Sequence, residues 1–71
     1  MEIRITATEK NITKLQKMEA AILYARDVTG TMTGTASAII KRENSIYTLV
    51  VVCSSCDDVK VVNRVHYKYG K

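Results

Sequence analysis

The first seven residues alternate between apolar and polar side chains. Odd positions carry the apolar set, Met1, Ile3, Ile5 and Ala7, and even positions carry Glu2, Arg4 and Thr6. A repeat of two with β-branched residues is typical of a half-buried strand. The pattern therefore predicts a strand over residues 1–7.

From Thr8 onward, apolar residues recur at steps of three and four. They fall on one helical stripe with Ile12 and Leu23 at its edge, and the stripe comprises Leu15, Met18, Ile22 and Ala25. Thr8 or Asn11 is expected to cap the start of this helix. Gly30 follows Thr29 and suits the left-handed conformation that often ends a helix. The spacing predicts a helix that ends at Thr29.

Three further strands are predicted after the helix. They run from Thr31 to about Lys41, from Ser45 to Cys53 and from Val59 to about Tyr69, with turns at residues 42–44 and 54–58. The middle one is apolar on both faces at its centre, over residues 49–52, which is typical of a central strand covered on both sides. Short connections favour an antiparallel meander, which the first strand joins through a right-handed helical crossover.

The expected fold class is α+β, with the order β-α-β-β-β, in one domain of residues 1–71. It is a four-stranded mixed sheet with one helix packed on one face. The helix-covered face is expected to hold Met1, Ile3, Ile5, Met32, Ala36, Ala38, Ile40, Val61 and Val65. The uncovered face is expected to hold Arg4, Thr6, Thr33, Thr35, Ser37, Ile39, Val62, Arg64, His66 and Lys68. Either the odd or the even residues of the central strand join the uncovered face, and either choice leaves apolar area there, which marks a contact site.

Size and composition narrow the function classes. The chain has 71 residues and a mass of 7.9 kDa, with 46% hydrophobic and 25% charged residues. These values exclude a disordered tail and a multi-domain enzyme. No apolar run approaches the roughly 18 residues of a membrane-spanning helix. Because no signal peptide precedes the first strand, we expect a reducing, cytoplasmic location.

The charge balance favours acidic or nucleic-acid partners. The formal net charge is +4 and the isoelectric point is about 9.3. From residue 60 onward there is no acid, and His66 lies among the cations Lys60, Arg64, Lys68 and Lys71. The tyrosines near these cations offer rings that stack on unpaired bases.

Cys53-Ser54-Ser55-Cys56 is the one recognisable short motif. Two cysteines at this spacing can share a zinc ion or form a redox dithiol. Further zinc ligands would have to come from His66, Asp57 or Asp58, or from a second subunit. The more frequent interpretation is a pair of ordinary free cysteines, so we expect no cofactor.

No constellation of residues indicates catalysis. Ser54, Ser55 and His66 lack the sequence context of an activated nucleophile. The segment 30–34 has two glycines but lacks the lysine and the following helix of a phosphate-binding loop. We therefore expect a binding protein that is not an enzyme and has no small-molecule substrate.

Eight residues are candidate contacts for a macromolecule. Those assigned to the sheet are Arg4, Tyr47, Arg64, His66 and Lys68, and those assigned to the helix are Lys10, Lys14 and Lys17. A charged helix face more often only keeps a protein in solution. The apolar area on the uncovered sheet face also predicts a homodimer.

The leading hypothesis is a small regulator or inhibitor that binds a nucleic acid or a protein that handles one. In size and strand order the chain resembles small accessory proteins of phages and other mobile elements, some of which block host defence systems. One alternative is direct, non-sequence-specific binding of DNA or RNA through a basic sheet face. A second is a zinc- or thiol-dependent module built on Cys53 and Cys56.

Overall fold

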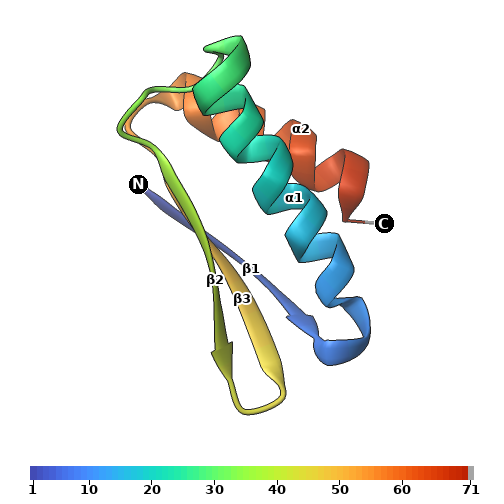
Figure 1. Cartoon of the computed structure of the whole chain (residues 1–71). Helices are drawn as coiled ribbons and strands as arrows, with labels where there is room; N and C mark the ends of the chain where they lie inside the picture. The colour runs from blue at the N-terminus through green and yellow to red at the C-terminus, as the bar shows by residue number, and fades with distance from the viewer. Residues whose placement is uncertain (71) are drawn as a thin grey trace.

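The computed structural model describes residues 1–70 and contains a three-stranded sheet with helices on one side (Figure 1). The strands are β1 (Glu2–Thr8), β2 (Ser37–Glu43) and β3 (Ile46–Val52). The helical segments are the 3₁₀ turn η1 (Glu9–Asn11), α1 (Ile12–Tyr24), the π-helical turn η2 (Ala25–Thr29) and α2 (Cys56–Tyr69). The α+β class is confirmed, whereas the prediction of four strands and one helix is wrong.

The sheet has the order β1-β3-β2, and both neighbours of β3 are antiparallel to it. The prediction that β3 is the central strand is confirmed, but the sheet is not mixed. One edge of β3 pairs with β2, and the other edge pairs with β1. The sequence pattern predicts residues 59–69 as the strand at that second edge. The pairing continues one residue beyond β1, because Met1 and Cys53 exchange backbone hydrogen bonds of 2.7 and 3.0 Å.

The helices cover the face of the sheet formed by the odd residues of β1 and β3. On this face Leu49 and Val51 are fully buried, and their cross-strand partners include Ile5 and Ala38. α1 lies against this face and α2 packs along α1, so both helices are on the same side of the sheet (Figure 1). The even residues of β3 therefore face the other way. These are Ile46, Thr48, Val50 and Val52.

The predicted helical stripe is confirmed by burial. Leu15, Met18 and Ile22 are at most 2% exposed, and Ala25 continues the stripe into η2. Thr8 and Asn11 occupy the N-cap positions of η1 and α1, as predicted, but their side chains accept no capping hydrogen bond. Gly30 ends the helical segment with a φ of 67°, as the pattern predicts.

The segment predicted as the last strand, residues 59–69, is instead the helix α2. Its inward side chains recur at steps of one, three and four residues: Val61, Val62, Val65 and Tyr69. Four valines and two tyrosines in this segment favour a strand by intrinsic preference, but burial against α1 outweighs that preference. The consequence is that residues assigned to both faces of a strand lie on a helix, including Val61, Val62, Arg64, Val65, His66 and Lys68.

The strand predicted from Thr31 to Lys41 begins later and ends later. Residues 31–36 form a loop that buries Met32 and Ala36, so Thr33 and Thr35 are not on the open sheet face. β2 runs through Glu43, and the chain reverses at residues 44–45, with Asn44 at a φ of 57°. Asparagine tolerates this left-handed conformation better than most residues.

A buried carboxylate joins this loop to the start of α2. Asp58 is 1% exposed, and its Oδ1 accepts hydrogen bonds from the backbone N–H of Thr33 at 2.8 Å and from the Thr33 hydroxyl at 3.1 Å. Its Oδ2 accepts from the backbone N–H groups of Ser54 at 2.8 Å and Ser55 at 3.2 Å. In return, the Ser55 hydroxyl accepts from the backbone N–H of Asp58, which completes a capping box.

These hydrogen bonds stabilise the charged form of the carboxylate. The backbone N–H of Thr33 contributes most to holding the pKa of Asp58 below its ordinary value, and burial partly opposes this effect. A carboxylate whose pKa is lowered by folding adds stability above its unfolded pKa of about 3.9. That stability is lost as the pH falls from there through the folded pKa.

We predict that Asp58→Asn lowers the midpoint of thermal unfolding at neutral pH by about 5–15 °C. The substitution replaces one carboxylate oxygen by an amide donor, so two of the four groups that now donate to Asp58 lose their acceptor. Circular dichroism melts at several pH values measure the effect. The gap between wild type and variant should narrow as the pH falls below about 4.

Asp57→Asn is the matched control, because Asp57 is the exposed neighbour and makes only a 4.0 Å ion pair with Lys60. Its melting midpoint should stay within about 3 °C of the wild type. Equal midpoints for the two variants, or a gap that does not change with pH, would show that Asp58 lacks this role.

Candidate functional site

Two adjoining hollows form a shallow groove between α1 and α2. One is lined by Ala21, Val61, Arg64, Val65, Lys68 and Tyr69. The other is lined by Lys17, Ala20, Ala21, Tyr24 and Tyr69. Tyr69 and Ala21 line both hollows. We call the five polar and aromatic lining residues, Lys17, Tyr24, Arg64, Lys68 and Tyr69, the basic groove.

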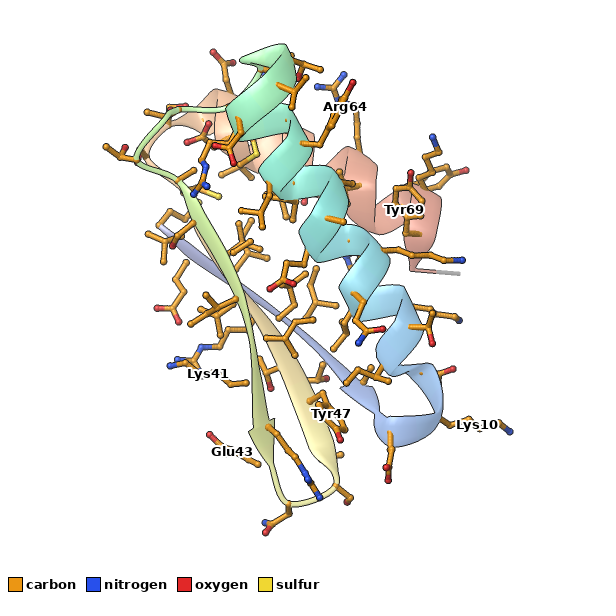
Figure 2. All side chains as sticks on the ribbon, in the orientation of Figure 1. Lys10, Lys41, Glu43, Tyr47, Arg64 and Tyr69 are labelled. Carbon is orange, nitrogen blue, oxygen red and sulfur yellow. The ribbon has the colours of Figure 1, made fainter. Side chains whose placement is uncertain are left out.

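Helical spacing brings these residues to the groove. Arg64 and Lys68 are four residues apart on α2, so they lie one above the other on the same flank. Ala21 and Tyr24 follow Lys17 at steps of four and three on α1. Alanines at positions 20 and 21 leave room above the backbone, which keeps the groove open. Figure 2 shows Arg64 and Tyr69 on the helical side of the molecule.

Several cations on the helical layer make no ion pair with an acid among the described residues. The ion pairs among residues 1–70 are Arg4–Glu2 at 2.8 Å, Arg26–Asp27 at 2.7 Å and Lys60–Asp57 at 4.0 Å. Within that described part of the chain, five cations have no ion-pair partner and lie on the helical layer: Lys10, Lys14, Lys17, Arg64 and Lys68. The Nζ of Lys68 lies 5.3 Å from the centre of the Tyr69 ring, which is a cation–π distance.

Not all of the predicted contact residues come together. Arg64, Lys68 and Lys17 share the groove, and Lys14 lies one turn from Lys17 on α1. Lys10 lies at the far end of the helical layer, in η1 (Figure 2).

His66 lies two residues from both Arg64 and Lys68, and this spacing puts it about 200° around the helix from each. Its ring lies against Gly70, where an added Cβ would be 2.6 Å from the ring. His66 is thus not part of the groove.

The prediction of a basic sheet face is wrong. Arg64, His66 and Lys68 are on α2, and Arg4 alone of the five sheet candidates lies on the open face, where Glu2 neutralises it. Tyr47 is half-buried on the helix-covered face, and the Arg42 guanidinium lies 5.9 Å from its ring centre.

The open face of the sheet is neutral and partly apolar. Its charged residues are two acids and two bases, Glu2, Arg4, Lys41 and Glu43. Three apolar side chains on it are 41–49% exposed: Ile39, Ile46 and Val52. Figure 2 shows Lys41 and Glu43 on the sheet, away from Arg64. The two sides of the molecule therefore offer different chemistry.

Tyr24, Tyr69 and Ala21 line the groove but are not among the eight predicted contact residues. Their meeting in one groove could not be predicted while residues 59–69 were assigned to a strand. Two signals point to the helix. Ser55 followed by Asp58 is the spacing of a capping box, and Asp57 precedes the bases near the C-terminal end, as the helix dipole favours.

The two cysteines differ in their surroundings. Cys53 is 3% exposed at the end of β3, whereas Cys56 is exposed in the first turn of α2, and both thiols are free. Burial, reinforced by the charge of Asp58, raises the pKa of Cys53, which disfavours its thiolate. Residues 1–70 contain no group of three or more His, Cys, Asp or Glu side chains that could hold a metal ion.

Comparison with protein-family models, curated proteins and solved structures gives no match for this chain. Within residues 1–70, neither helix has the length and hydropathy needed to cross a bilayer. The resemblance to phage accessory proteins rests on a strand order that the structure corrects.

We predict that one thiol per chain reacts rapidly with Ellman's reagent in the folded protein. Cys56 is the reactive one, since Cys53 is buried and its thiolate is disfavoured. Cys56→Ser should remove the rapid phase, and the remaining thiol should react only in denaturant. Rapid reaction of both thiols, or retention of one zinc ion per chain after purification without chelator, would support the metal or dithiol alternative instead.

Proposed function

We propose that the protein is a small, non-enzymatic regulator that acts by binding single-stranded nucleic acid in the basic groove. The observation that carries the proposal is the set of cations with no ion-pair partner among residues 1–70, lying beside two tyrosines between α1 and α2.

The cations of the basic groove support phosphate as the ligand. Lys17, Arg64 and Lys68 border a groove whose floor is apolar, so a charged backbone can follow the rim without entering the core. Lys14 on α1 and Lys10 in η1 extend the positive charge beyond the groove. Neutralising phosphates releases bound counterions, and this release drives most binding that does not depend on base sequence.

The tyrosines favour unpaired bases over a duplex. Tyr24 is 57% exposed and Tyr69 is half-buried, and both line the same hollow. A base can stack on an exposed aromatic ring only when it is out of a duplex, and each stacked base contributes about 1–3 kcal/mol. The combination of rings and cations therefore supports single strands as the ligand.

A protein that binds a nucleic acid without changing it chemically can act as a regulator. A 71-residue protein that occupies a single strand excludes the larger proteins that would otherwise handle it. The competing candidate is an acidic protein surface, which the same cations would attract. That candidate does not need the tyrosines, and this difference separates the two in the experiments below.

We predict that a single-stranded oligonucleotide of about 16 nucleotides binds with strong salt dependence. If three cations contact phosphates, the slope of log K against log salt should be about −2, and with five contacts about −3.5. Fluorescence anisotropy measures it. Absence of binding at low salt would reject the proposal and leave the acidic protein surface as the ligand.

We predict that Arg64→Glu with Lys68→Glu weakens this binding by about ten- to a hundred-fold, because two phosphate contacts become repulsive. The matched control is Lys41→Glu with Arg42→Glu, which changes the net charge equally but lies at the end of β2. The control should retain affinity within about three-fold. Equal losses in both variants would mean that only net charge matters.

We predict that Tyr24→Leu weakens binding by about five- to fifty-fold through loss of stacking, with the salt slope unchanged. Tyr67→Leu is the control, since Tyr67 is 73% exposed on α2 and does not line the groove. If Tyr24→Leu binds as the wild type does, stacking plays no part and the proposal for single strands is contradicted.

A further inference from the structure

We infer that a second copy of this chain packs face to face on the open side of the sheet. This inference concerns a different surface from the basic groove and does not rest on nucleic-acid binding. The open face consists of the apolar residues Ile39, Ile46, Val50 and Val52 with Thr48, bordered by Glu2, Arg4, Lys41 and Glu43.

The register places the apolar residues in one stripe. Val52, Val50, Thr48 and Ile46 run along the central strand, and Ile39 lies beside Val50. Val50 is 6% exposed, whereas Ile39, Ile46 and Val52 are each more than 40% exposed. Contiguous apolar area of this kind on a small protein marks a contact surface.

The charges on the open face lie at two opposite corners. Glu2 and Arg4 occupy one end of β1, and Lys41 and Glu43 occupy the other end of β2. The remaining two corners carry no charge: Thr6 and Thr8 on β1, and Ser37 and Ile39 on β2.

This arrangement suits a two-fold axis. An axis along the strands brings β1 of one copy over β2 of the other, so each charged corner meets an uncharged corner. An axis across the strands reverses each strand and gives the same result. In both cases β3 lies over β3 of the second copy, and no like charges face each other.

The charge on the rest of the molecule favours a second copy over another partner. The four formal charges of the open face sum to zero, whereas five cations without an ion-pair partner among residues 1–70 lie on the opposite, helical layer. Pairing through the sheets therefore keeps the two basic layers as far apart as the molecule allows. A neutral face gives no attraction for an acidic protein or a nucleic acid.

The area predicts a weak dimer. Three strands of seven residues span about 14 by 24 Å, or roughly 340 Å² of footprint per copy. Because side chains corrugate the surface, the accessible area buried by both copies is on the order of 1,000 Å², which is at the lower end of specific interfaces. We expect dissociation in the micromolar range.

Sedimentation equilibrium over a range of concentrations tests the dimer. The mass of the wild type should rise from 7.9 kDa towards twice that value. Val52→Lys should remain monomeric, whereas Val28→Lys, at a 65% exposed position in η2, should dimerise as the wild type does. Monomer at every concentration, or a dimer that survives Val52→Lys, overturns the inference.

A cross-linking experiment tests the same interface without disrupting it. It also gives an answer if Val52→Lys does not fold. In a Cys56→Ser background, Thr48→Cys places a thiol near the expected two-fold axis. A short bis-maleimide cross-linker should join two copies through this thiol, because face-to-face sheets lie about 10 Å apart and a direct disulfide spans at most about 7 Å between Cα atoms. Val28→Cys in the same background is the control, and its two copies should not be cross-linked, because residue 28 lies away from the open face. Equal cross-linking in both variants overturns the face-to-face arrangement.

Discussion

The buried Asp58 carboxylate determines how the two halves of this chain meet. It accepts four hydrogen bonds, two from Thr33 and one each from the backbones of Ser54 and Ser55. These bonds fix the end of β3, the start of α2 and the loop that leads into β2. A buried charge is tolerated only when it is hydrogen-bonded in this way. The direction in which α2 leaves the sheet, and hence its place beside α1, follows from this contact.

Placing both helices on one side of the sheet separates two kinds of surface. The helical layer gathers lysines, an arginine and tyrosines around the groove between α1 and α2. The opposite side is left as an uncovered sheet face on which two acids and two bases cancel. We propose phosphate as the ligand of the helical layer and a second copy as the partner of the sheet face. The three strands and two helices are thus enough to form both the basic groove and the open sheet face.

Part of the fold can be predicted from the hydrophobic pattern. In those segments the apolar residues fit only one repeat, either that of a strand or that of a helix. The odd residues of β1, the stripe containing Leu15 and Met18, and the central position of β3 are predicted correctly. The expectation that β3 is covered on both sides is wrong, because Val52 on its other face is 41% exposed. Residues 59–69 are predicted wrongly because valines at 59, 61, 62 and 65 fit a period of two nearly as well as 3.6. At the site, Lys17, Arg64 and Lys68 are identified by charge alone. Their grouping, and the exclusion of His66 and Tyr47, depend on which residues form α2.

Chemical-shift mapping by NMR tests the central claim, that phosphate binding belongs to the helical layer and not to the sheet. Titration with a single-stranded oligonucleotide should shift the backbone amides of residues 17–24 and 61–69. The amides of β2, including those of Ile39 and Lys41, should remain unchanged in the same titration. Shifts concentrated on β1 and β2, with the helical amides unaffected, would contradict the account.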